Sequence, residues 1–271
     1  MKIRPPAPLV RAGFATCDSL GWLLHELFGL GPGLYELEKL LDLPRPVSQR
    51  AAWASAALTA KNHNLRRLLR HFGSAILEGC VRWHTPPHEL RERQHRQQAT
   101  LLVGWHLGAP FALAQALSQE GLQALFCVGP PPGHRVPPGI EFVTSDGGLM
   151  QRSKALHQAL HALKKGETVY VVADHPEISK QTVAMWGRPI SLAPSLGMLA
   201  RLGQAQVIPV ISSWQRGGWM EVRHFDPLAA ASEAEVFQEI GRFFEDYIRL
   251  HPALLEEKSL MKLLHCPPCE G

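Results

Sequence analysis

The sequence has few cysteines, and their arrangement argues against a disulfide-stabilised secreted domain. Five cysteines occur in 271 residues, an odd number without the regular spacing of secreted frameworks. This usage favours a reducing compartment, and we expect a cytoplasmic protein. Cys266 and Cys269 form a single CxxC beside His265, which fits half of a metal site or a redox pair. Because the sequence holds no second CxxC, we expect no metal, and no cofactor is required.

Long apolar runs are also lacking. Residues 20–30 are mostly apolar, but a His-Glu pair interrupts them, and the segment is shorter than the roughly 20 residues that span a bilayer. No signal-peptide cleavage pattern follows it. The segment fits either an amphipathic helix on a membrane surface, with Trp22, Leu23, Leu27 and Phe28 on its apolar side, or a helix packed on the core. The first interpretation predicts peripheral contact with the inner face of the cell membrane.

The excess of positive charge is small. A formal net charge of +4 and a pI near 8.9 do not indicate nucleic-acid binding, and they are compatible with anionic lipid or an acidic carrier protein. Seven arginines fall in one stretch: Arg66, Arg67, Arg70, Arg82, Arg91, Arg93 and Arg96. They form either a solvated helix face or an anion-binding surface.

The chain divides by pattern into three parts. Apolar positions recur at three-to-four spacing in residues 51–60 and 65–76, which predicts helices. We therefore expect a helical N-terminal section over residues 1–98 that packs on the core. An α/β core is expected over residues 99–255, and a C-terminal tail over residues 256–271.

Apolar runs alternate with helical patterns after residue 99. Strands are predicted at 101–105, 124–128, 140–143, 169–173, 207–212 and 219–224, and helices up to 117 and at 150–163, 192–202 and 232–249. This alternation predicts an α/β fold with a mixed, mainly parallel sheet flanked by helices. Because sites form at the carboxyl ends of such strands, His106, Asp174 and residues 185–197 are candidate site positions.

The residues around His106 resemble a known motif. The sequence GWHLG at 104–108 is similar to the first motif of the lysophospholipid acyltransferase superfamily, specifically its lipid A late acyltransferase branch. Further similar segments follow in the order of that family: RSKAL at 152–156, ALKKGE at 162–167, VVADH at 171–175, MWGRP at 185–189, GMLAR at 197–201, VIPV at 207–210 and IRLHP at 248–252. The resemblance covers roughly residues 20–260.

The resemblance implies a glycerolipid acyltransferase-like fold and a function in lipid metabolism. The implied reaction moves a fatty acyl group from an acyl thioester, on acyl carrier protein or CoA, to a lipid or another hydroxyl or amine acceptor. His106 would act as the general base. Asp174 would bind or orient the site, although an Asp at a strand end is often only a cap.

Other residues are predicted to bind the substrates. Arg152 and Arg188 suit phosphate groups, although each is also explained as an ordinary exposed charge. Backbone N–H groups near Gly187 or Gly197 are candidate oxyanion donors. The candidate acyl-pocket residues are Phe111, Trp186 and Leu196, which are equally explained as core residues.

One position departs from the family pattern. In the family, four residues separate the histidine from an Asp or Glu. In this chain Phe111 occupies the position of that acid. Three interpretations stay open: Asp174, Glu141 or Glu177 replaces the missing acid, His106 acts without one, or the fold is catalytically degenerate. A degenerate fold would bind acyl chains or acyl carrier protein without turnover. A third class, an α/β-hydrolase esterase, is disfavoured because no Gly-x-Ser-x-Gly elbow is present.

Overall fold

A computed structural model describes residues 6–28, 41, 44–109, 112–128, 136–144, 148–174, 181–230 and 232–255. Phe111, Glu177 and the tail with Cys266 and Cys269 lie outside the described residues, as does the side chain of Phe28. The expectations for these positions therefore remain predictions.

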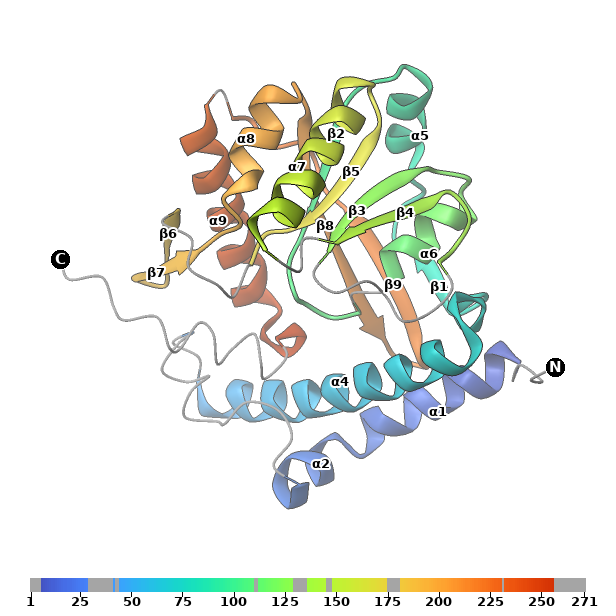
Figure 1. The fold of residues 1–271 in the computed structure, drawn as a ribbon. Coiled ribbons are helices and arrows are strands. Elements are labelled where there is room, and N and C mark those ends of the chain that lie inside the picture. The colour runs from blue at the N-terminus through green and yellow to red at the C-terminus, as the bar shows by residue number, and fades with distance from the viewer. Residues whose placement is uncertain are drawn as a thin grey trace.

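A seven-stranded sheet forms the centre of the described structure (Figure 1). Its strands stand in the order β1-β9-β8-β2-β5-β3-β4, and every neighbouring pair is parallel except β8 and β9. The strands are β1 (Val81–Trp83), β2 (Thr100–Gly104), β3 (Ala124–Val128), β4 (Ile140–Thr144), β5 (Thr168–Val172), β8 (Gln206–Gln215) and β9 (Trp219–His224). The predicted mixed, mainly parallel sheet flanked by helices is confirmed.

Helices cover both faces of the sheet. One apolar cluster joins it to α7 (Leu149–Lys164), α8 (Ser195–Leu202) and α9 (Glu233–Leu250), and a second joins its other face to α6 (Ala112–Gln119) and to N-terminal helices. The side chain of Ser232 caps α9 by accepting a hydrogen bond from the Glu235 N–H at 3.3 Å. Phe244 of α9 is completely buried against the sheet. A short helix, α5 (His88–His95), connects β1 to β2.

The two central strands send the chain in opposite directions. After β2 the chain passes through α6 to β3 on one side, and after β5 it passes through α8 to β8 on the other. Such a reversal leaves a crevice at the carboxyl ends of the two strands, where ligands bind in open α/β sheets. The sheet therefore places its candidate site between the ends of β2 and β5.

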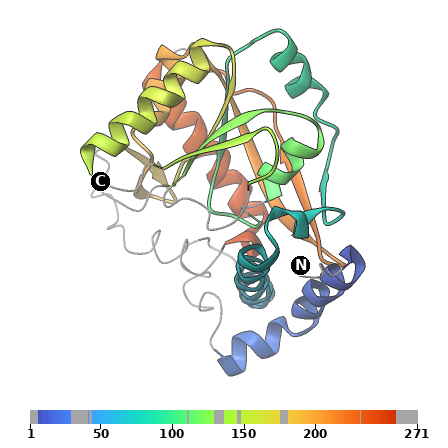
Figure 2. The same cartoon turned by 45° about the vertical axis from the view of Figure 1, so that its right-hand side comes forward.

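The N-terminal helices lie along that edge. They are α1 (Ala7–Ser19), α2 (Gly21–Phe28) and the long α4 (Arg45–Phe72), which crosses below the sheet (Figures 1 and 2). Val10 and Phe14 of α1 belong, with Leu65 and Leu69 of α4, to the apolar cluster that includes residues of β8 and β9. Within the described part of the chain, no helix has the length and apolar character needed to cross a membrane.

Several elements differ from the sequence predictions. The predicted helix at 51–60 and most of the one at 65–76 form a single helix, α4, which ends at Phe72 with Gly73 as its cap. The strand β1 falls within the section for which only helices were expected, since three residues are too few to produce a strand pattern. The helix predicted from residue 192 begins at Ser195, because Leu192 pairs with Asp174. A hairpin of β6 (Thr182–Met185) and β7 (Arg188–Ser191) was not predicted.

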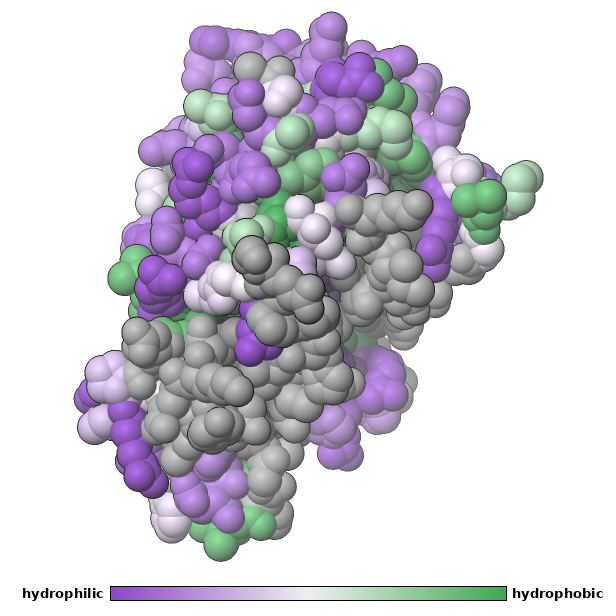
Figure 3. Space-filling model, turned by 90° about the vertical axis from the view of Figure 1, so that its left-hand side faces the viewer, coloured by the Kyte–Doolittle hydropathy of each residue, from purple (hydrophilic) through white to green (hydrophobic). Residues whose placement is uncertain are grey.

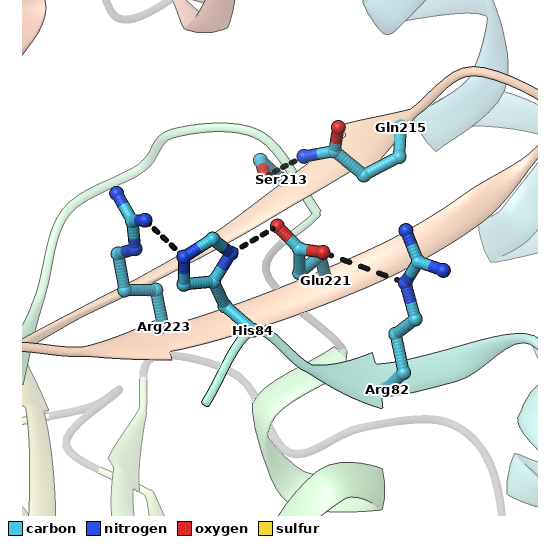
Figure 4. Close-up of polar contacts among 6 residues, drawn as sticks. All are labelled: Arg82, His84, Ser213, Gln215, Glu221 and Arg223. Carbon is cyan, nitrogen blue, oxygen red and sulfur yellow. Dashed lines mark hydrogen bonds and ion pairs between the residues drawn. The ribbon is translucent and has the colours of Figure 1, made fainter. Parts of the chain in front are cut away.

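A polar face is exposed on β1 and β9. Glu221 of β9 accepts from Arg82 and lies 3.1 Å from the Nδ1 of His84, whose other ring nitrogen contacts Arg223 (Figure 4). The opposite face of β9 carries Met220 and Val222, which are fully buried. This alternation explains why one face of this sheet edge is closed by ion pairs and the other packs in the core.

Candidate active site

His106 lies immediately beyond the carboxyl end of β2. All five residues of β2 are buried, and Trp105 continues into the core, where its ring lies 4.8 Å from that of Phe244. The next side chain points out of the core, and 46% of the His106 side chain is exposed. The structure therefore places His106 at a strand end, as predicted, with its side chain partly exposed.

Asp174 meets His106 from the end of β5. The His106 backbone N–H donates to Asp174 Oδ1 at 2.8 Å, and the His106 Nδ1 lies 3.0 Å from Asp174 Oδ2. The backbone around this pair is fixed as well, because the Ala173 N–H donates to the Gly104 carbonyl at 2.8 Å. The two residues are 68 positions apart in the sequence and adjacent in the fold. We call them the His106–Asp174 pair.

The His106–Asp174 pair has the geometry of a base and its orienting acid. A carboxylate can only accept, so the hydrogen on the imidazole sits on Nδ1 and the lone pair on Nε2. Only 9% of the Asp174 side chain is exposed, which makes its charge more effective on the ring. Of the carboxylates considered as partners of His106, Asp174 is thus in hydrogen-bond contact with it.

Glu141 does not take this role. It lies on β4, which two strands, β5 and β3, separate from β2. Adjacent strands are about 4.8 Å apart, so β4 lies roughly 14 Å from β2. Glu141 is also at the beginning of its strand, whereas His106 follows the end of β2.

Two glycines beside His106 have steric explanations. A Cβ on Gly104 would overlap the hydroxyl of Tyr170, and one on Gly108 would overlap the carbonyl of Ser212. Gly108 also has a φ of 61°, which favours glycine. Burial raises the pKa of Tyr170, and the nearby Asp174 charge raises it further, so the phenol beside the pair stays neutral.

The loop after His106 is held from three sides. The Ala109 N–H donates to the Ser212 carbonyl at 2.8 Å, and the Gly108 N–H donates to the Leu254 carbonyl at 3.1 Å. The side-chain amide of Asn62, on α4, donates to the Gly108 carbonyl at 2.6 Å. These bonds join the loop to β8, to the segment after α9 and to the N-terminal helices.

Asn62 is a site-supporting residue that the sequence did not reveal. It is 1% exposed, and its Oδ1 accepts from the Nε1 of Trp214 at 2.8 Å. A buried amide in a mainly apolar interior is costly unless it is paired in this way. The only sequence signal was a polar residue on the apolar stripe of α4, shared with Leu58, Leu65 and Leu69.

The β6–β7 hairpin follows Asp174 and returns to it. Leu192, just after β7, pairs with Asp174, and the Ala193 N–H donates to the Ala173 carbonyl at 2.8 Å. Trp186 and Gly187 form its tip with φ angles of 50° and 68°, as a two-residue type I′ turn requires. Gly187 thus has a conformational explanation as a turn residue. Half-buried Trp186 packs at the margin of the core and donates its backbone N–H to Glu245.

Leu196 and Gly197 belong to the interior of the protein. Leu196, a candidate for the acyl pocket, is fully buried within the apolar cluster under α8 and α9. A Cβ on Gly197 would lie 2.8 Å from the ring of Phe237, which shows that glycine permits the close packing of α8 on α9. Both residues were named for a site, and both have packing roles.

Arg152 and Arg188 stand on separate elements. Arg152 is exposed in the first turn of α7, and half-buried Arg188 begins β7. Two large apolar side chains, Leu149 and Met150, precede Arg152 and are more than 80% exposed. The start of α7 therefore presents apolar and cationic groups side by side.

The comparisons with known proteins agree with the predicted superfamily. Residues 143–254 match the family model of bacterial lipid A biosynthesis acyltransferases. The match supports a relation to acyltransferases over less than half of the chain. It includes Asp174, Arg152 and Arg188, and it leaves out His106 and Phe111.

A solved structure resembles the whole chain more distantly. The crystal structure of the 1-acyl-sn-glycerophosphate (LPA) acyltransferase PlsC from Thermotoga maritima covers 92% of this chain and 96% of its own, with 15% identity and a TM-score of 0.37. At this level no residue or activity is carried over. No curated protein matches the sequence.

Proposed function

We propose that this protein is an acyltransferase that moves a fatty acyl group from a thioester to a hydroxyl or amine acceptor. The observation that supports the proposal is the His106–Asp174 pair, with two contacts of 2.8 and 3.0 Å at the switch point of the sheet. The family match over residues 143–254 supports the same class of reaction.

In the proposed mechanism, His106 Nε2 takes the proton from the acceptor as its oxygen or nitrogen attacks the thioester carbonyl. Asp174 keeps the ring in the required tautomer and stabilises the imidazolium that forms. The tetrahedral intermediate then collapses with cleavage of the carbon–sulfur bond. The leaving thiolate receives the proton from the imidazolium, so His106 returns to its initial state.

The intermediate carries a negative oxygen that needs hydrogen-bond donors. In this proposal they come from the first turn of α8, which includes Gly197 and begins at Ser195, two residues after Ala193, whose N–H donates to Ala173. Amide groups in the first turn of a helix point outwards at its amino end and favour negative charge. Gly187 is the second donor considered, from the hairpin tip.

The acceptor is proposed to be a lipid with a phosphate group. Exposed Leu149 and Met150 at the start of α7 lie next to Arg152, and an apolar surface beside a guanidinium suits such a molecule. Arg188 is the second proposed phosphate ligand. The donor is proposed to be acyl carrier protein or acyl-CoA.

Contact with a membrane surface is proposed for α2. Trp22 and Leu27 are 52% and 67% exposed, while Gly21 packs α2 closely on α4. Figure 3 shows a small hydrophobic area among hydrophilic residues at the lower end of the molecule, and Figure 1 shows α2 at that end. A helix that keeps such residues out of the core fits an interfacial position better than a core-packing one.

Turnover of long-chain acyl carrier protein and acyl-CoA, each with a panel of lipid and amine acceptors, tests the proposal. We expect transfer by wild type and none by His106→Ala, with donor binding retained. Arg152→Gln and Arg188→Gln should raise KM for phosphate-bearing acceptors and leave amine acceptors without phosphate unaffected. Donor binding without transfer by wild type would reject the proposal and identify a degenerate, binding-only fold.

A further inference from the structure

A groove separates α1 from the carboxyl-terminal half of α4. Its volume is about 770 Å³, within the range of roughly 300–1,000 Å³ that small-molecule sites occupy. Val10 and Phe14 of α1 are buried at its base, and Leu68 and Phe72 of α4 line it together with exposed Leu9. The interior of the groove is therefore apolar and open to solvent.

The margin of the groove is cationic. Arg67, Arg70 and His71 line it from α4, and both arginines are exposed. The Arg70 Nε donates to the carbonyl of Arg66 at 3.4 Å, which directs this side chain along the helix. All the lining residues belong to the described part of the chain, and none of them carries a carboxylate. The charge at the margin therefore favours an anion.

The groove is distinct from the site of the His106–Asp174 pair. Its lining residues on α4, among them Asn64, Leu68 and His71, follow a spacing of three to four and so share one face of the helix. Asn62 and Leu65, which face the core and the His106 loop, lie on another face. Helix α4 thus lies between the groove and the loop after His106.

We propose that this groove binds one anionic lipid, with an acyl chain over Phe14 and Leu68 and a phosphate or carboxylate headgroup on Arg67 and Arg70. An apolar interior with a cationic margin matches a molecule that is apolar at one end and anionic at the other. A lipid surface is the source, because exposed Leu9 lines the groove, and exposed Trp22 and Leu27 lie on α2, the helix that follows α1. The proposal does not depend on acyl transfer.

Gly13 offers a way to block the groove without disturbing the fold. It lines the groove in the middle of α1, and a Cβ at this position would have no atom within 4 Å. Gly13→Leu should therefore fill the groove, and leucine favours a helix more than glycine does. Ala12→Leu is the matched control, since Ala12 is exposed on the same helix and does not line the groove.

The cationic margin has a matched control as well. Arg67→Gln/Arg70→Gln removes two charges from the groove, and Arg45→Gln/Arg50→Gln removes two exposed charges from the other end of the same helix. A cation near an anionic lipid surface strengthens binding about fivefold. The groove pair should therefore weaken binding at least about tenfold, and the control pair less than about twofold.

Calorimetry of the full chain with monomeric dodecyl phosphate, inorganic phosphate and dodecyl maltoside separates the contributions. We expect wild type to bind dodecyl phosphate at the groove, with at least about tenfold loss in Gly13→Leu and none in Ala12→Leu. Inorganic phosphate and dodecyl maltoside should bind much more weakly, because each lacks one half of the ligand. Binding to vesicles containing phosphatidylglycerol should follow the same order of variants, and His106→Ala should match wild type.

Two outcomes would overturn the proposal. Equal binding of dodecyl phosphate by wild type, Gly13→Leu and Arg67→Gln/Arg70→Gln would place the ligand elsewhere. No binding by wild type, with a lowered melting temperature in Gly13→Leu, would mean that protein atoms fill the groove in solution. Neither result bears on acyl transfer, which is measured separately with His106→Ala.

Discussion

The strand-and-helix core and the N-terminal helices handle their apolar side chains differently. In the core, buried residues pack on both faces of the sheet, and the large exposed ones are few and scattered over residues 149–250. The N-terminal helices expose four large apolar residues within 19 positions: Leu9, Leu20, Trp22 and Leu27. This concentration on two short, consecutive helices is the observation behind the membrane contact that we propose.

The core and the N-terminal helices also differ in what they contribute to the proposed function. The core supplies the His106–Asp174 pair from the ends of β2 and β5, so the acid–base chemistry that we propose depends on strands that are far apart in the sequence. The N-terminal helices supply Asn62, which holds the loop after His106, and the surface that we propose meets lipid. The following predictions test whether chemistry and lipid contact can be altered independently.

The largest effect is expected for Asp174→Asn. The amide keeps the shape of the side chain but no longer fixes the tautomer or stabilises the imidazolium. The corresponding change in serine proteases lowers kcat by about 10⁴, and we expect a loss of about 10³–10⁴ with a much smaller change in KM. Steady-state kinetics on a soluble acceptor measures it.

Asp246→Asn is the control for this change, since Asp246 is an exposed carboxylate on α9. It should behave as wild type. If Asp174→Asn retained more than about a tenth of the wild-type kcat while folding normally, the assignment of Asp174 as the orienting acid would be wrong.

A smaller loss is expected for Asn62→Leu, which extends the comparison to the N-terminal helices. The change leaves the Gly108 carbonyl and the Trp214 Nε1 without their described bonds to Asn62. Unpaired buried groups cost about 1–3 kcal/mol each, so the free energy of unfolding should fall by a few kcal/mol. Displacement of the loop by about 1 Å should lower kcat by about 10²-fold.

Trp214→Phe separates the two bonds of Asn62. It removes the Nε1 donor and keeps the contact between Asn62 and the Gly108 carbonyl. We therefore expect a loss of stability with kcat close to wild type. Equal kcat losses in the two variants at a temperature where both are folded would show that the bond between Asn62 and the Gly108 carbonyl does not account for the effect on kcat.

The proposed membrane contact predicts an effect confined to α2. Trp22→Ser/Leu27→Ser should weaken binding to anionic vesicles by about tenfold or more, because each change removes an exposed apolar side chain from lipid. Kinetics with a soluble acceptor should not change. The control, Leu202→Ser/Leu250→Ser, removes two exposed leucines from the surface of α8 and α9. It should bind vesicles as wild type does. Equal weakening in both pairs would contradict a specific role of α2.

The sequence predicted well those features that depend on local pattern. β3 and β9 begin and end at the predicted residues, because short apolar runs bounded by turns identify strands. The β6–β7 hairpin was missed, since its strands have four residues each and alternate too briefly. Its turn glycine, Gly187, was instead considered as a substrate ligand.

The site shows the same limit. His106 and Asp174 were both recognised at strand ends, but their pairing depends on β2 and β5 being neighbours, which local pattern does not determine. For Leu196 the sequence left a pocket and a core position open, because an apolar side chain has the same pattern in both. Asn62 was missed because its partner, the Gly108 carbonyl, is 46 residues away.

The smallest effect concerns two cysteines, one in each region. Burial raises the pKa of Cys127, on β3, to about 12, so almost none of it is thiolate at pH 8. Burial also raises the pKa of Cys17, on α1, but this residue lies on a partly exposed helix. Iodoacetamide labelling followed by peptide mass spectrometry should modify Cys127 at least tenfold more slowly than Cys17. Equal rates in the native protein would show that the sheet around β3 opens as readily as the N-terminal helices, which would remove the distinction between a protected core and a more accessible helical surface.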